Sequence, residues 1–331
     1  MHAYPEAPPA RRRVSRCWRI AAALALVAAC GIAPVCRRLE TLTRAIPGQR
    51  PGYGPRAISP VPNLAAIDRM IWMPGLDDGW NPQGLAFARG SLFVSAYRSL
   101  ATWKDRGPCR VFRIDPRTGR VTGHFAVPPP CGHAGGLAYA GDGKLFIGDT
   151  HTLFETSLGR AFGGGEPKFR IWRMGGGLKG AFAISGQGSI WIGDYQSQGP
   201  AMAFKFNLSV LDAHSGRGTL DPRAAAAVVA IPTYAQGGAI GSRGGLWIAR
   251  SDLGWGALDR LDPASGTRTA RYRVAGGIEG IAFDGDGRLW CVSEAGARHQ
   301  PLRYPFFPLL FRLDPSRLHP ASRTTDGVRR G

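Results

Sequence analysis

The sequence predicts an all-β protein built from repeated antiparallel sheets, and three observations support this prediction. A glycine, an apolar strand, a tight turn and a second apolar strand follow one another five times along the chain. The second strands begin 43–56 residues apart, a period that suits units of four short strands. The 47 Gly and 26 Pro residues are spread through the 331-residue chain, and no helix-length amphipathic run follows residue 45, which argues against a helical bundle.

The five repeats account for two strands in each unit. The first strand of each begins with glycine, at Gly84–Phe87, Gly136–Tyr139, Gly180–Ala183, Gly238–Ile240 and Gly280–Phe283. The second strand starts 8–10 residues after that glycine, at Leu92–Ser95, Leu145–Asp149, Ile190–Asp194, Leu246–Ala249 and Leu289–Ser293. Strands this close together need a tight turn, so each pair is expected to be a hairpin.

The two outer strands of a unit are visible between the repeats. Arg110–Asp115 and Arg120–Val127 flank the turn Pro116–Gly119, and Ala257–Asp262 and Arg268–Val274 repeat this arrangement later in the chain. These segments alternate apolar and polar residues, as half-solvated strands do.

Five such units fit a β-propeller with four-stranded antiparallel blades, in which the two chain ends close the ring within one blade. The last repeat has strands only at 280–284, 289–293 and 308–313. The stretch Ala66–Met73 can supply the missing strand and so leave only short protected edges. We therefore expect five blades, with six as the alternative.

The chain divides into four predicted segments. Residues 1–36 form an export signal, a lipoprotein signal or a membrane anchor, and residues 37–64 form a linker rich in Pro and Gly. The propeller is expected at 65–318, and residues 319–331 are expected to be a disordered basic tail.

The first segment has the pattern of an export signal. Five Arg residues between positions 11 and 19 precede the apolar run Ile20–Ala29. The following Cys30, after two small residues, resembles the lipidated cysteine of a bacterial lipobox. Three alternatives remain: a lipoprotein, a cleaved soluble protein, or an uncleaved anchor formed by the 17 uncharged residues Ile20–Cys36. All three export the domain, and two of them attach it to a membrane through the N-terminus.

The net charge of +19 lies largely at the ends of the chain. Residues 1–60 hold ten Arg but only two acidic residues. A nucleic-acid-binding domain needs a dense basic stripe on its folded part. We therefore expect no nucleic-acid partner.

Two cysteines flank the predicted outer hairpin of the first blade. Strand pairing brings the ends of that hairpin together, so Cys109 and Cys131 are expected to form a disulfide in an oxidising compartment. Cys291 lies within a predicted strand and is expected to be a buried small hydrophobic residue.

The phrase Gly280–Trp290, with its weaker copies, resembles the blades of the gluconolactonase and senescence-marker-protein group and of NHL-type propellers. For the lactonases of that group, the resemblance implies one divalent cation, such as calcium, held in the channel by a Glu, two Asn and an Asp. This chain has Gln83 at the first-blade position of the Glu, and its only asparagines are Asn63, Asn81 and Asn207. The ligand set therefore does not carry over residue by residue, and the metal stays unassigned.

Candidate site residues follow from the direction of the strands. Positions just before an inner strand and just after the second strand lie on one face, because antiparallel neighbours alternate in direction. The first set is Gln83, His133, Lys179, Gln236 and Glu279, and the second includes Tyr97, Asp149, Asp194, Asp252 and Glu294. These side chains are expected to surround one channel mouth. Asp149 and Asp194 are expected to accept hydrogen bonds from backbone amides of the turn that follows each of them, instead of binding a ligand.

Two classes of function fit these residues. In the first, an exported, membrane-associated propeller binds a small molecule or a protein at its channel mouth through Gln83, Lys179, Gln236, Tyr97 and Asp252. In the second, a lactonase or esterase-type hydrolase, with or without a divalent metal, uses Glu279, His133 and Glu294 for general acid–base catalysis. No nucleophile elbow, Walker loop or HExxH motif is present in the sequence.

Overall fold

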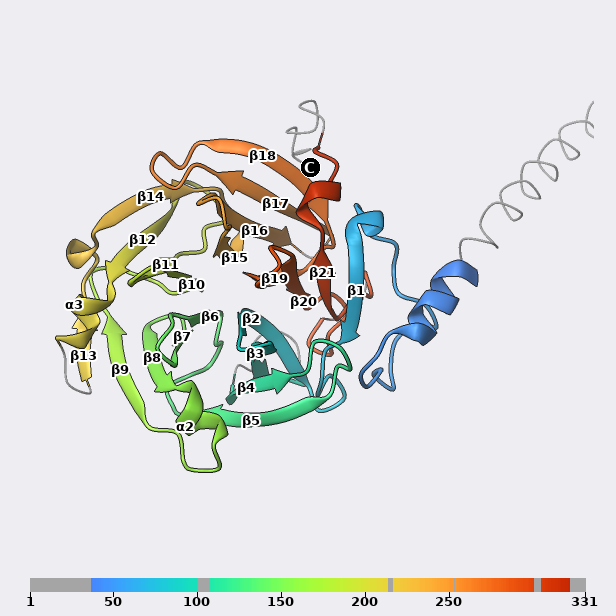
Figure 1. Cartoon of the computed structure of the whole chain (residues 1–331), viewed down its shortest axis with the longest axis horizontal. Helices are drawn as coiled ribbons and strands as arrows, with labels where there is room; N and C mark the ends of the chain where they lie inside the picture. The colour runs from blue at the N-terminus through green and yellow to red at the C-terminus, as the bar shows by residue number, and fades with distance from the viewer. Residues whose placement is uncertain (1–36, 101–106, 214–216, 253, 301–304, 322–331) are drawn as a thin grey trace, which may run out of the picture. The chain divides into compact units, whose positions relative to one another are not determined.

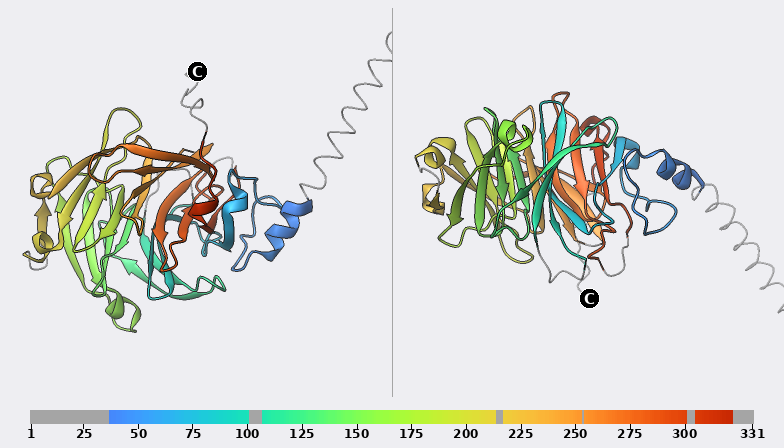
Figure 2. Two further views of the ribbon diagram at one scale, coloured as in Figure 1. Left: turned by 45° about the horizontal axis from the view of Figure 1, so that its top comes forward. Right: turned by 90° about the horizontal axis from the view of Figure 1, so that it is seen from below.

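The computed structural model describes residues 37–100, 107–213, 217–252, 254–300 and 305–321. Five antiparallel sheets surround a central axis, so the predicted five-bladed β-propeller is confirmed (Figure 1). Seen from the side, the strands of each blade run between the two faces of the ring (Figure 2).

The blades are numbered along the chain, and each is given from its inner strand outward. Blade 1 contains β2 (Trp80–Ala88), β3 (Ser91–Arg98), β4 (Cys109–Ile114) and β5 (Val121–Val127). Blade 2 contains β6 (Gly136–Tyr139), β7 (Lys144–Gly148), β8 (Thr152–Ser157) and β9 (Phe169–Met174). Blade 3 contains β10 (Phe182–Gly186), β11 (Ser189–Gly193), β12 (Ala201–Asn207) and β14 (Ala227–Ile231). Blade 4 contains β15 (Ala235–Ile240), β16 (Leu246–Asp252), β17 (Trp255–Leu261) and β18 (Arg268–Val274).

Blade 5 joins the two ends of the described propeller. Its strands are β19 (Ile278–Phe283), β20 (Leu289–Ser293), β21 (Leu309–Leu313) and β1 (Ile67–Trp72). The outermost strand, β1, pairs antiparallel with β21, with Met70 opposite Phe311 and Ile71 opposite Leu310. The predicted closure of the ring by an N-terminal strand is therefore confirmed.

Glycines let the inner strands approach one another at the axis. A Cβ at Gly84 would lie 2.5 Å from the Leu137 nitrogen of the next blade. A Cβ at Gly280 would overlap the Leu85 nitrogen in the same way, and Gly136 and Gly237 have equally close neighbours across their blade boundaries. The side chain of glycine is the only one small enough for this approach. Three of the five repeated glycines recognised in the sequence, Gly84, Gly136 and Gly280, thus share a packing role near the axis, whereas Gly180 and Gly238 lie against the side chains of Met174 and Ile184.

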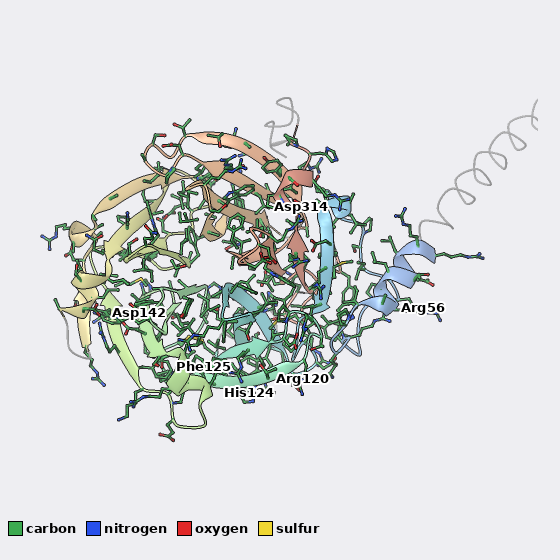
Figure 3. The ribbon with its side chains drawn as sticks, in the orientation of Figure 1. Arg56, Arg120, His124, Phe125, Asp142 and Asp314 are labelled. Carbon is green, nitrogen blue, oxygen red and sulfur yellow. A yellow bond between two sulfur atoms is a disulfide. The ribbon has the colours of Figure 1, made fainter. Side chains whose placement is uncertain are left out.

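The spaces between blades are filled by alternate side chains of the strands. His124 and Phe125 are consecutive residues of β5; His124 is exposed and Phe125 is 5% exposed (Figure 3). The Phe125 ring packs at 5.2 Å from Phe162, which follows blade 2's third strand in a short helix, α2 (Leu158–Phe162). The two-residue period that predicted the outer strands therefore also determines which side chains form the core between blades.

One additional strand was not predicted. β13 (Arg217–Leu220) follows the short helix α3 (Leu208–Asp212) of blade 3 but pairs in parallel with β9 of blade 2. Only Leu220 of its four residues is buried, so the segment lacks the apolar alternation by which the other strands were recognised. Three 3₁₀ turns complete the regular structure, at Leu64–Ala66, Pro222–Ala224 and Pro315–Arg317.

The stretch expected to be a linker is heterogeneous. Residues 37–45 are helical, and within the compact unit that contains them the Ile58 nitrogen donates to Thr43 Oγ1 at 3.0 Å. Residues 46–55 and the chain from Ser59 onward belong to the propeller unit. The predicted targeting segment 1–36, including Cys30, lies outside the described residues. Within the described part of the chain, no helix has the length and apolar character needed to cross a membrane.

The start of the expected tail is attached to the propeller. Pro320 forms a bridge with Tyr272 of β18, and the His319 nitrogen donates to Asn63 Oδ1 at 2.9 Å. Residues 322–331 lie outside the described part of the chain.

The close approach of the inner strands predicts that one methyl group added at Gly280 lowers the stability of the fold strongly. Gly280→Ala should destabilise the protein by about 3 kcal/mol, because its Cβ meets backbone that cannot move away. Gly285→Ala is the matched control, since no atom lies within 4 Å of its Cβ and the change should stay within about 0.5 kcal/mol. Denaturant unfolding measures both changes. Equal stability of the two variants would contradict the packing role of Gly280.

Candidate functional site

A cavity opens along the axis on one side of the glycines. Its volume is about 590 Å³. The space between the axial glycines themselves has essentially no volume, and a separate space of about 90 Å³ lies among apolar residues of the inner strands. The described residues therefore form a cup that the glycines close at its base. Its lining residues are Gln83, Tyr97, His133, Thr150, Lys179, Gly180, Ala181, Tyr195, Gln236, Glu279, Glu294, His299 and Gln300.

The cavity brings together most of the side chains selected from the sequence. One residue before or at the start of each inner strand contributes to it, namely Gln83, His133, Lys179, Gln236 and Glu279. Tyr97 at the end of β3 and Glu294 after β20 also line it. Asp252, the remaining ligand-binding candidate, is an exposed residue at the end of β16 and is not part of this lining.

Asp149 and Asp194 hold backbone groups, but the donors to Asp149 lie in the loop before β6 and not in the turn that follows this residue. Asp149 Oδ1 accepts from the nitrogens of His133 and Ala134 at 2.6 and 2.9 Å. Asp194 Oδ1 accepts from the Met202 nitrogen at 2.6 Å. Neither residue lines the cavity, so these two carboxylates shape the loops around it.

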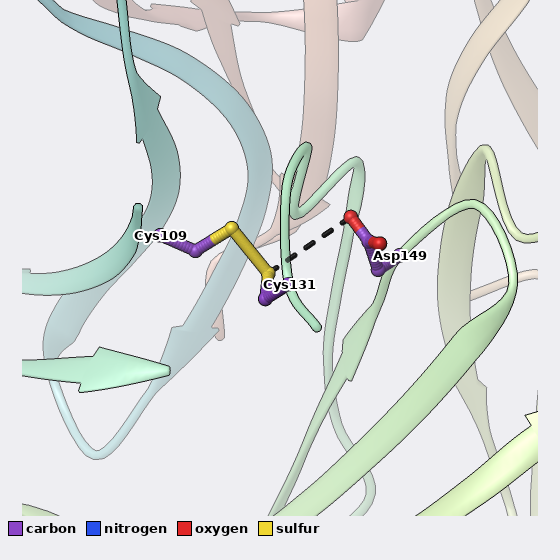
Figure 4. A group of neighbouring side chains, drawn as sticks. All are labelled: Cys109, Cys131 and Asp149. Atoms are coloured by element: carbon purple, nitrogen blue, oxygen red, sulfur yellow. Dashed lines mark hydrogen bonds between the residues drawn. A yellow bond between two sulfur atoms is a disulfide. The ribbon is translucent and has the colours of Figure 1, made fainter. Parts of the chain in front are cut away.

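The loop that carries His133 is fixed from two directions. Besides the contact with Asp149, it is joined to β4 by a disulfide between Cys131 and Cys109, whose Cα atoms are 5.9 Å apart (Figure 4). The imidazole of His133 packs against the Tyr97 ring, with 5.4 Å between centroids. These contacts hold the imidazole at the cavity wall.

Glu279 is a buried carboxyl without a compensating partner. It follows Ile278 in β19, where the pairing with β20 is irregular, and its side chain is 4% exposed. Among the described residues, no group donates a hydrogen bond to its carboxyl and no basic side chain forms an ion pair with it. Burial raises the pKa of Glu279 well above the usual value, and the nearby charge of Glu294 raises the pKa further. The site therefore favours the neutral, proton-bearing form of this carboxyl.

Glu294 has the opposite environment. Its Oε2 accepts from Gln83 Nε2 at 3.0 Å and lies 3.3 Å from His299 Nε2. Its Oε1 accepts from Gln300 Nε2 at 3.4 Å. Hydrogen bonds donated to a carboxyl favour its ionised form. The two glutamates of this cavity thus have contrasting hydrogen-bonding environments.

Sequence reasoning missed Asn81 and Gln300 of this cluster, and it placed His299 only in a long loop at the channel mouth. Asn81, which is fully buried at the start of β2, contacts His299 Nδ1 through Oδ1 at 2.5 Å. His299 and Gln300 belong to the long segment after β20, which has no strand-like period. The only sequence signal for His299 and Gln300 was the unusual length of this loop, because long ordered loops in compact domains are commonly functional.

The cavity does not offer a divalent cation a suitable set of ligands. Both oxygens of Glu294 accept hydrogen bonds from amide groups, and Lys179 adds a positive charge to the lining. In the described part of the chain, only Cys109, Cys131 and Asp149 form a group of three ligand atoms within 4.8 Å, and the two cysteines are already joined as a disulfide. Calcium prefers six to eight oxygen ligands. The cation implied by the lactonase resemblance is therefore not supported by these residues.

Comparisons with known proteins place the fold but not the family. The sequence matches no family profile and no curated protein significantly. Among solved structures, a glutaminyl cyclase from Myxococcus xanthus is 16% identical with a TM-score of 0.52, and the alignment covers 77% of this chain and 97% of that one. This similarity agrees with the assignment of the chain to the β-propellers.

Two further structures also match. A PQQ-bound aldose sugar dehydrogenase from Streptomyces coelicolor is 14% identical over 70% of this chain and 94% of that chain, with a TM-score of 0.42. A calcium-binding protein, regucalcin, from Agrobacterium tumefaciens is 17% identical over 70% of this chain and 89% of that chain, with a TM-score of 0.38. The described strands themselves define a β-propeller with an axial cavity lined by polar and aromatic side chains.

The burial of Glu279 predicts a pH-dependent stability difference. Because its folded pKa lies above that of the unfolded chain, the unfolded chain releases this proton first as the pH rises. Wild-type stability should therefore fall relative to Glu279→Gln from about pH 4.5 up to the raised pKa, by at most about 1.4 kcal/mol per pH unit. Thermal melts of both proteins between pH 4 and pH 9 measure this. A difference that does not change with pH would show that the carboxyl is not desolvated in the folded state.

Proposed function

We propose that the protein binds a small polar molecule in the axial cavity. The observation that supports this best is the convergence of side chains from all five inner-strand starts on one cup closed at its base. A volume of about 590 Å³ falls in the range of small-molecule sites, about 300–1,000 Å³. A folded protein partner could reach only the rim of such a cup, so a small ligand fits it better.

The lining indicates which ligand chemistry is complementary. Gln83, Gln236 and Gln300 offer amide groups, and the neutral carboxyl of Glu279 offers a proton donor. Lys179 supplies a positive charge, and the rings of Tyr97 and Tyr195 supply apolar faces. A compact molecule with carbonyl and hydroxyl or amide groups matches this combination.

A second candidate function is acyl transfer on that ligand, in the form of lactone or ester hydrolysis. It is favoured by the buried Glu279, to which no described group donates a hydrogen bond, because a carboxyl whose pKa is raised by burial can act as a general acid. His133 and Glu294, the two other residues predicted to take part in acid–base catalysis, line the same cavity. No metal takes part in this proposal.

The test uses three defined probes: a δ-lactone, an aryl ester, and a peptide with an N-terminal Gln, the last suggested by the name of the glutaminyl cyclase that shares the fold. Glu279→Gln should lower turnover of any active probe by about 100-fold or more. The control Glu166→Gln removes an exposed glutamate outside the cavity lining and should leave turnover unchanged.

The outcomes separate the two candidates. Saturable binding of a probe that is weakened in Glu279→Gln, without turnover, supports a binding protein. Turnover that is lost in Glu279→Gln but kept in the control Glu166→Gln supports the hydrolase. Binding or turnover that is identical in wild type and both variants would place the activity outside this cavity.

We also propose that the domain is exported and attached to a membrane through its N-terminus. The basic and apolar segments before Cys30 support this, and a disulfide between Cys109 and Cys131 fits an oxidising compartment. No nucleic-acid partner is proposed.

Lipidation at Cys30 is tested by metabolic labelling with a fatty acid. The parent protein should incorporate label and fractionate with membranes, whereas Cys30→Ala should lose the label, because its lipid attachment site is absent. Cys17→Ala, in the same segment, is the control and should keep the label. Labelling that survives in Cys30→Ala, or is absent from the parent, removes the lipoprotein alternative and leaves an anchor or a cleaved signal.

A further inference from the structure

The amide of Asn81 fixes the position of one proton on His299. Asn81 Nδ2 lies 3.0 Å from the Gly79 carbonyl oxygen and 3.3 Å from that of Ser99, so the amide nitrogen must point toward these acceptors. The Asn81 oxygen consequently faces His299 Nδ1 at 2.5 Å. A carboxamide oxygen only accepts hydrogen bonds, so Nδ1 carries a hydrogen in either charge state of the ring.

The opposite nitrogen of the ring then determines the protonation of the His299–Glu294 pair. His299 Nε2 lies 3.3 Å from Glu294 Oε2. With Nδ1 already protonated, an unprotonated Nε2 would direct its lone pair at a carboxylate oxygen, which is repulsive. One proton must therefore lie between the two atoms, and the pair is neutral as a whole. The amide donors of Gln83 and Gln300 on Glu294 favour the carboxylate form of this side chain as the acceptor.

We propose that Glu294 is the general base of the axial cavity, positioned and charge-balanced by His299 and Asn81, and that Glu279 is the acid that works with it. This inference rests on the acyl-transfer function proposed above. It assigns different roles to two carboxyls because their surroundings differ: Glu294 accepts hydrogen bonds on both oxygens, whereas no described group donates one to Glu279. Environments that separate two carboxyls in this way define an acid and a base.

The proposed hydrolysis of a lactone or ester balances without any further reagent. The Glu294 carboxylate removes a proton from water, and the water oxygen forms a bond to the carbonyl carbon. The carbon–oxygen bond to the alcohol group then breaks, and the Glu279 carboxyl gives its proton to the departing oxygen. Glu294 ends protonated and Glu279 ionised, so the return of one proton from Glu294 to Glu279 restores the site. The net reaction consumes one water molecule.

Other titratable groups face the same space and affect this division of roles. Lys179 precedes β10 and adds a positive charge to the lining. His133 precedes β6, and Tyr97, at the end of β3, packs its ring against His133 at 5.4 Å and His299 at 6.0 Å. Tyr195 lines the outer part of the cavity and is 39% exposed.

The first test needs no substrate. Infrared spectroscopy of the full folded domain at pH 7 should show a protonated-carboxyl band that is absent in Glu279→Gln and present in Glu294→Gln. In His299→Gln, Glu294 loses its balancing charge, so a second such band should grow at mildly acidic pH. His124→Gln, on the exposed side of β5, is the matched control and should leave the spectrum unchanged.

Loss of the band in Glu294→Gln, with retention in Glu279→Gln, would reverse the roles and overturn the proposal. If either glutamine variant does not fold, a pH series of the wild-type protein still decides. A protein with no protonated-carboxyl band at neutral pH has no such acid in its cavity, and the proposal is then wrong.

The second test uses whichever of the three probes the wild-type protein turns over. Each glutamine variant should lose about 100-fold or more in kcat, and the pH–rate profile should lose its acidic limb in Glu294→Gln and its alkaline limb in Glu279→Gln. His299→Gln should lower kcat more than it changes KM, because His299 acts through Glu294. If both limbs of the pH–rate profile persist in Glu294→Gln and Glu279→Gln, the assignment of Glu294 as base and Glu279 as acid is wrong. If the infrared bands appear as expected but none of the three probes is turned over, only the acyl-transfer function is contradicted.

Discussion

The closeness of the five inner strands is the constraint on which the rest of the structure depends. Each inner strand contacts the inner strands of its two neighbours, and glycines remove the Cβ atoms that would keep them apart. A ring this narrow has no open axis at that level, so the channel becomes a cup instead of a pore. The same glycines bring the preceding side chains, such as Gln83 and Glu279, to one enclosed space.

Enclosure explains why two chemically identical side chains behave differently. Glu279 lies near the start of an inner strand, where it is buried and no described group donates a hydrogen bond to its carboxyl. Glu294 follows the second strand of the same blade and meets amide groups from β2 and from its own loop. Because Glu279 and Glu294 lie at different strands of blade 5, their carboxyls meet different surroundings. The fold produces this contrast without requiring a metal ion.

Periodicity made the propeller predictable, because every inner hairpin repeats the same packing requirement. Gly84, Gly136 and Gly280 recur at the same place in the repeat, and residues just before or after the repeated strands could be placed at one mouth from strand direction alone. Asn81 and His299 could not be placed in this way. Their contact joins residues 218 positions apart in the sequence, through a loop without a period. The strand β13 escaped prediction because its pairing with another blade, and not its own sequence pattern, makes it a strand.

The pairing of β1 with β21 has a consequence for the order in which the chain acquires its structure. β1 is among the first propeller segments to be synthesised, and its only strand partner in the described fold, β21, is the last strand of the chain. At typical rates of synthesis the interval between them lasts on the order of tens of seconds. Until β21 emerges, the backbone of β1 remains an unpaired edge and the ring cannot close. The nascent chain is therefore an open arc for most of its synthesis, and its central cup is completed last.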